Sequence, residues 1–155
     1  MKLDVIDRRI LQVLQKEGRI ANADLADKVG LSASACLRRM RALEESGIIA
    51  SYVALLDQTK LGRRMDVFVE ISLVGQSNEI LEAFEKAVVR ASEVMDCFLM
   101  AGDADYMLRV TAADPLDFER IHREQLARLP GVLRMKTSFA IRPIVRTTAF
   151  PMDTK

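Results

Sequence analysis

Three arginines stand close together in a segment whose apolar residues recur at helical spacing. They are Arg38, Arg39 and Arg41, and no acidic residue occurs between Ser32 and Leu43. Guanidinium groups bind phosphates and make paired hydrogen bonds to base edges, and a helix fits the major groove of B-DNA. The segment therefore predicts a surface that binds double-stranded DNA.

These arginines do not share one side of the predicted helix. At about 100° per residue, Ser34, Arg38 and Arg41 fall on one face. Arg39 falls at its flank, and the opposite face is apolar: Cys36, Met40 and Leu43, with Leu37 flanking them. Because the N-terminal part of a reader helix usually points at bases, we expect Ser32, Ser34 and Arg38 in the groove. A phosphate contact by Arg41, with Arg39 beside it, completes the predicted DNA-binding set.

A solvated surface helix is the structural alternative. Such helices usually mix charge signs through i,i+4 pairs, whereas Glu44 and Glu45 stand only at the far end of this one. The turn Val29-Gly30-Leu31-Ser32 follows a short helical pattern and favours DNA binding, because a helix-turn-helix presents its second helix to the major groove.

Two further helices must hold this reader in place. Apolar spacing predicts helices over residues 4–18, 22–30 and 32–46, with N-caps at Asp4, Asn22 and Ser32. Gly18, Gly30 and Gly47 are the expected stops. Apolar residues within 48–55 predict a short strand or hairpin, and a linker follows that ends near Gly62. The first domain is therefore expected to span residues 1–62.

The rest of the chain repeats a strand–helix–strand pattern. Alternating or apolar runs predict strands at 67–73, 94–101, 106–111 and 132–149, the last bent at Pro143. Asn78 is expected to cap one helix, and Asp114-Pro115 is expected to start another. The order βαββαβ is the ferredoxin-like arrangement. The sequence thus predicts an α+β protein, with a three-helix winged helix-turn-helix domain and a ferredoxin-like domain over residues 63–155.

Composition limits the function classes. The net charge is only +1, with +2 on residues 1–60 and −1 on residues 61–155, so a DNA contact must come from a local patch. Cys36 and Cys97 form no CxxC pair, and His122 is the single histidine. We therefore expect no metal, no cofactor and no enzymatic activity, with Cys36 acting as a small buried hydrophobe.

The cellular location is predicted from the charges near the N-terminus and from the length of the apolar segments. Charges occupy the positions where a signal peptide needs an apolar run. No uninterrupted apolar segment approaches the roughly 20 residues that span a bilayer. Two unlinked cysteines suit a reducing compartment. We expect a cytoplasmic, nucleoid-associated protein with no membrane partner.

With these motifs in view, the chain resembles the Lrp/AsnC, or feast/famine, family of bacterial and archaeal transcription regulators. The resemblance covers nearly the whole chain and is carried by LDVIDRRILQVLQKEGR, LADKVGLSASACLRRMRALEESGII, MAGDADYMLRV and the ending TTAFP. It implies that the C-terminal half is a RAM domain, which pairs through its sheet into homodimers that often assemble into octamers. It also implies a small amino-acid effector and DNA bound at two half-sites related by a two-fold axis.

The same resemblance places an effector pocket at the GDADY loop. The implied effector-binding residues are Met100, Ala101, Gly102, Asp103, Ala104, Asp105, Tyr106 and, on the last strand, Ser138. Gly102 permits close approach to the backbone, N–H groups at such a turn can hold a carboxylate, and Asp103 or Asp105 can hold an ammonium group. A plain β-turn is the structural alternative, because Gly and Asp favour turns for local reasons.

Two functions are compatible with these features. The first is a sequence-specific transcription regulator whose activity responds to a small amino acid. The second is an architectural, nucleoid-type protein that organises DNA with low sequence specificity and no obligatory effector. Salt dependence and the ratio of specific to non-specific affinity separate the two.

Overall fold

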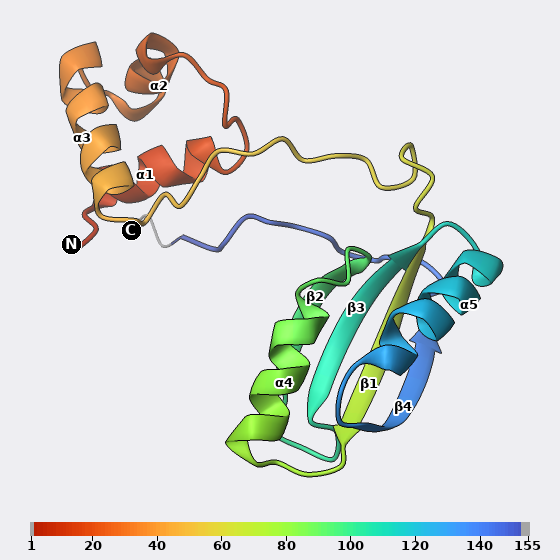
Figure 1. Ribbon diagram of the computed structural model, residues 1–155. Coiled ribbons are helices and arrows are strands. Elements are labelled where there is room, and N and C mark those ends of the chain that lie inside the picture. Colours follow the sequence, from red (N-terminus) through yellow and green to blue (C-terminus); the bar gives the residue numbers. More distant parts are fainter. Residues whose placement is uncertain (1, 153–155) are drawn as a thin grey trace. The chain divides into compact units, whose positions relative to one another are not determined.

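The computed structural model describes residues 2–152, and the chain divides into two compact units (Figure 1). The first unit holds the chain up to Leu55 together with the segment that begins at Val145, and the second holds Leu56–Ile144. This division differs from the single boundary near residue 62, because the C-terminal segment returns to the first unit.

Three helices build the first unit: α1 (Val5–Leu14), α2 (Asn22–Val29) and α3 (Ala33–Glu45). They enclose a core of Ile10, Leu11, Leu14, Leu25, Ala26, Val29, Cys36 and Leu43. Cys36 and Leu43 are fully buried, as the apolar face of the third helix predicts. This core fixes which side of α3 is left for a ligand.

The helix ends agree only in part with the predicted caps. Asp4 caps α1, and Ser32 caps α3 through a hydrogen bond from the Ala35 N–H. The prediction that Asn22 caps α2 is wrong: the N-cap is Ala21, and the Asn22 side chain donates to the Ala33 carbonyl at 2.8 Å. Its amide therefore joins the start of α2 to the start of α3. The expected stop at Gly18 is also wrong, because α1 ends at Leu14.

The predicted strand within residues 48–55 is absent, since this part of the described chain has no strand pairing. A strand needs a neighbouring backbone to accept its hydrogen bonds, and a single chain offers none here. Val53 and Leu55 are 75% and 70% exposed. The Tyr52 side chain has one hydrogen bond: its hydroxyl donates to Glu44 at 2.9 Å. Partial burial is the larger cause, and this hydrogen bond the smaller, that raises the pKa of Tyr52 to about 12.

The second unit is a four-stranded antiparallel sheet with helices on one face (Figure 1). Its elements are β1 (Met65–Leu73), α4 (Asn78–Val88), β2 (Val94–Leu99), β3 (Tyr106–Ala112), α5 (Pro115–Glu124), a 3-10 turn (Leu126–Arg128) and β4 (Val132–Phe139). The strand order β2-β3-β1-β4 confirms the ferredoxin-like prediction. Two details were wrong: β4 ends at Phe139, four residues before Pro143, and α4 has Ser77 as its N-cap.

Alternation along the strands gives this sheet one covered and one uncovered face. Val67, Val69 and Ile71 are fully buried and pack in the core with residues of α4 and α5. Phe68 and Phe98 point to the opposite side, where they are 38% and 58% exposed. The two helices of the second unit, α4 and α5, pack on the other face.

The C-terminal segment docks on the first unit through one side-chain amide. The side-chain oxygen of Gln15 accepts a hydrogen bond from the Phe150 backbone N–H at 2.6 Å, and the side-chain NH2 group of Gln15 donates to the Phe150 backbone carbonyl at 3.2 Å. Met152 packs against the three-helix core. The chain therefore passes between the two units twice. None of the helices within residues 2–152 has the length and apolar character required to cross a membrane.

Candidate nucleic-acid interface and effector loop

A tight turn sets α3 against α2. Gly30 adopts a left-handed conformation with φ of +72°, which glycine adopts without steric cost. The Leu31 N–H then donates to the Ala26 carbonyl at 2.9 Å, and Ser32 caps the next helix. Two helices joined by such a short turn form a helix-turn-helix, in which the second helix is the one presented to DNA.

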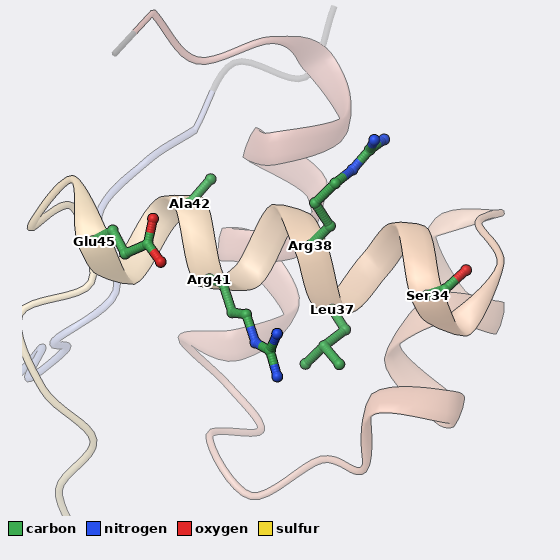
Figure 2. Close-up of a pocket in the computed structure, with 6 residues that line it drawn as sticks. All are labelled: Ser34, Leu37, Arg38, Arg41, Ala42 and Glu45. Carbon is green, nitrogen blue, oxygen red and sulfur yellow. The ribbon is translucent and has the colours of Figure 1, made fainter.

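The outer surface of α3 carries charge without internal partners. Ser34, Arg38 and Arg41 are exposed, and they line a hollow on this helix together with Leu37, Ala42 and Glu45 (Figure 2). Among the described residues, neither Arg38 nor Arg41 forms an ion pair. Figure 2 shows both side chains extending away from the helix, with Ser34 at one end and Glu45 at the other. Both guanidinium groups are thus available to an anion.

Ser32 and Arg39 are placed differently from these two arginines. The Ser32 hydroxyl accepts the Ala35 N–H and lies 3.3 Å from the Ser34 hydroxyl, so it stabilises the start of α3. The Arg39 guanidinium lies 2.7 Å from carboxylates of both Asp4 and Asp7 on α1. A DNA contact by either residue stays a prediction.

The GDADY loop joins β2 to β3 and leaves its middle exposed. The Met100 N–H donates to the Asp105 carbonyl, and the Asp105 N–H donates to the Ile71 carbonyl, both at 2.8 Å. The backbone N–H groups of residues 101–104 have no acceptor within the described part of the chain. A Cβ atom added at Gly102 would meet no atom within 4 Å. The loop therefore offers exposed backbone donors next to the free Asp103 carboxylate.

Asp105 and Tyr106 act inside the fold. One Asp105 carboxylate oxygen accepts the Leu73 N–H and the other accepts the Gln76 side chain, each at 2.7 Å. The Tyr106 ring is 1% exposed and stacks on Phe84, and its hydroxyl donates to Glu85 at 2.7 Å. Burial and this bond raise the pKa of Tyr106. Between the two aspartates that the sequence left open, Asp103 is the one free to bind a ligand.

Ser138 lies away from the loop within one chain. It pairs with Phe68 on β1, whereas the loop is held at Ile71 and Leu73. Its strand, β4, is the edge of the sheet opposite β2. The expected role of Ser138 in the same pocket therefore requires a second copy of the chain.

Gln76 was not predicted to belong to the site, because it lies 29 residues before Asp105, whose carboxylate accepts its side-chain hydrogen bond. We expect Asp105→Asn to lower the free energy of unfolding of the second unit by about 1.5–3 kcal/mol, because hydrogen bonds to a charged acceptor are lost. Urea unfolding followed by circular dichroism measures this. Asp103→Asn is the matched control and should change stability by less than about 0.5 kcal/mol. Equal midpoints for the two variants would contradict the structural role of Asp105.

A helix-turn-helix domain followed by a ferredoxin-like domain with an exposed loop defines a class: DNA-binding transcription regulators that carry a ligand-binding domain. Residues 3–50 match the family described as winged helix-turn-helix DNA-binding, and residues 66–150 match the Lrp/AsnC ligand binding domain. The chain belongs to the Lrp/AsnC family. It is a transcription regulator and not an enzyme.

Relatives of similar length support this membership. The Bkd operon transcriptional regulator of Pseudomonas aeruginosa is 44% identical and covers 97% of this chain and 99% of its own. The leucine-responsive regulatory protein of Escherichia coli is 39% identical, with coverages of 99% and 93%. An AsnC family regulator from Agrobacterium tumefaciens has a similar structure, with a TM-score of 0.92, 38% identity and coverages of 96% and 97%. A transcriptional regulator from Neisseria meningitidis, solved as an L-Met complex, has a TM-score of 0.92, 35% identity and coverages of 97% for both chains.

Proposed function

We propose that this protein is a sequence-specific DNA-binding regulator whose DNA binding responds to a small amino acid held by the second unit. The observation that carries the DNA part is the outer face of α3, where Arg38 and Arg41 are exposed and have no ion-pair partner among the described residues. Arg38, nearer the start of the helix, suits a base edge, and Arg41 suits a phosphate. Ser34 lies on the same face.

The exposed loop supports an amino-acid effector. A zwitterion needs hydrogen-bond donors for its carboxylate and an anion for its ammonium group. Backbone N–H groups of residues 101–104 supply the first, and the Asp103 carboxylate supplies the second. The relative from Neisseria meningitidis that was solved with L-Met has the same fold, which favours an amino acid as the ligand class.

The uncovered sheet face supports pairing of two copies. Phe68 and Phe98 are exposed on it, next to the ion pairs Lys136–Glu70 and Arg109–Asp96. A two-fold dimer through this face would cover both phenylalanines and place two reader helices on one DNA molecule, as half-site recognition requires.

Calorimetric titration of the full chain with each of the twenty amino acids tests the effector. We expect at least one to release or absorb heat and to raise the melting temperature, because a ligand that binds the folded state stabilises it. Asp103→Ala and Gly102→Leu should abolish this response and leave the unliganded melting temperature unchanged. Lys86→Ala, on the exposed surface of α4, is the control and should respond normally. No heat and no thermal shift with any amino acid would overturn the effector proposal.

A further inference from the structure

One arginine of the reader helix is committed to the protein itself. The Nη1 atom of Arg39 lies 2.7 Å from the Asp4 carboxylate and 2.7 Å from the Asp7 carboxylate. These contacts span 35 and 32 positions of sequence and join α3 to the start of α1. The Arg39 side chain is 31% exposed, whereas Arg38 and Arg41 are classed as exposed residues.

The two acidic partners need this cation. Asp4 and Asp7 form a reciprocal capping box, in which each carboxylate accepts the other residue's backbone N–H at 2.8 and 3.1 Å. This arrangement brings two negative charges together, and Asp7 is a buried residue, 7% exposed. Arg39 is the cation that contacts both within the described residues. Removing it would leave a buried carboxylate without compensation, which destabilises folded proteins strongly.

The direction of Arg39 follows from its place on the helix. It is separated by about 100° from Arg38 and by about 160° from Arg41 around the axis. The Arg39 guanidinium group contacts Asp4 and Asp7 at the start of α1, and Arg39 is not among the residues that line the hollow with Arg38 and Arg41. The bridge fixes how α3 is turned on α1, and so which side chains face outward.

We propose that Arg39 is a positioning residue: it locks the rotation of α3 through Asp4 and Asp7 so that Arg38 and Arg41 face DNA, and it makes no DNA contact itself. This rests on the proposed function of α3 as the reader helix. It reverses the role that the sequence alone assigned to Arg39, and it separates three neighbouring arginines into two that bind and one that orients.

The matched variants Arg38→Ala, Arg39→Ala and Arg41→Ala test this in the full chain. The affinities for a duplex selected from random sequence with the wild-type chain, and for a scrambled duplex of the same composition, are measured at several salt concentrations. A phosphate contact contributes about 0.9 to the slope of log K against log salt. We expect Arg41→Ala to lose about that much for each half-site, and Arg38→Ala to relax sequence preference. Arg39→Ala should weaken binding to the selected duplex and keep the wild-type slope.

A second measurement uses the unchanged chain and needs no variant to fold. Two hydrogen bonds lower the pKa of Asp4: the larger effect comes from the backbone N–H of Asp7, and the next from the Arg39 side chain. The NMR signal of the Asp4 carboxyl group therefore reports on the Arg39–Asp4 ion pair. When the duplex is added, we expect the guanidinium signals of Arg38 and Arg41 to shift, while those of Arg39 and the Asp4 carboxyl stay in place. In folded Arg39→Ala the pKa of Asp4 should rise, and in the other two variants it should not.

The outcomes are separable. A slope loss of about 0.9 for each half-site in Arg39→Ala, or a guanidinium shift of Arg39 on addition of DNA, would overturn the positioning role. Unchanged affinity and sequence preference in both Arg38→Ala and Arg41→Ala would instead overturn α3 as the reader, whatever Arg39 does. The proposal is supported if Arg39→Ala binds DNA weakly with the wild-type salt slope, and Arg41→Ala shows the reduced salt slope expected for a lost phosphate contact.

Discussion

Replacing Arg38 and Arg41 together by alanine is expected to abolish selective DNA binding while the fold is kept. Both side chains are exposed and make no ion pair with the described residues, so their removal leaves no buried group unpaired. A base contact by Arg38 is worth about 1–3 kcal/mol of discrimination per half-site. A phosphate contact by Arg41 adds about 0.9 to the salt slope for each half-site. Fluorescence anisotropy on a selected duplex measures both losses.

The matched control for this variant is Arg123→Ala in the second unit. Arg123 is also an exposed arginine on a helix, and it pairs with Glu119 at 2.7 Å. Its removal changes the net charge in the same direction without touching α3. If the control weakened DNA binding as much as the double variant, the loss would reflect overall charge, and the assignment of α3 as the reader would be wrong.

Carboxylates placed on the uncovered sheet face are expected to separate the dimer. The double variant Phe68→Asp/Phe98→Asp replaces two apolar side chains of the proposed interface by carboxylates in each copy. A two-fold dimer would therefore bury four new negative charges. Burying such unpaired charges costs several kcal/mol per ion. Folding should be little affected, because the neighbouring core residues Val67 and Val69 face the other side. Analytical ultracentrifugation should show a dimer or larger assembly for the wild type and a monomer for the variant.

Loss of the dimer should weaken DNA binding as well. Linking two reader helices raises apparent affinity by about 10²–10⁴ through effective concentration, so the monomeric variant should lose a factor in that range. Leu116→Asp, on α5 on the helix-covered side, is the control, since Leu116 is 81% exposed and its replacement leaves the uncovered face intact. A monomeric wild type, or a double variant that still dimerises, would contradict the proposed interface.

Local pattern predicted most of the architecture. The apolar spacing of residues such as Cys36 and Leu43 gave the buried side of α3, and the alternation around Val69 gave β1. Cap assignments were less reliable: Asp4 and Ser32 cap as expected, whereas the Asn22 side chain binds a carbonyl 11 residues away. A local rule does not include such a partner.

The division of roles among the predicted site residues could not be read from the sequence. Asp103 and Asp105 are equivalent in a turn motif, and only the contacts of Asp105 with Leu73 and Gln76 distinguish them. Arg39 sat at an intermediate angle on the helix, and its acidic partners lie more than 30 residues earlier. A strand within residues 48–55 was expected from apolar composition, but a strand forms only where a second backbone pairs with it, and none pairs with this segment in the described chain.

The most direct test of the central claim is the ratio of affinities for a selected duplex and for a scrambled duplex of the same length and composition, measured in one buffer. For the wild-type chain we expect a ratio of roughly 10³ or more, as specific DNA-binding proteins show. For the Arg38→Ala/Arg41→Ala variant it should fall towards one. A wild-type ratio near one, with affinity that depends steeply on salt, would contradict sequence-specific regulation and indicate an architectural DNA-binding protein instead.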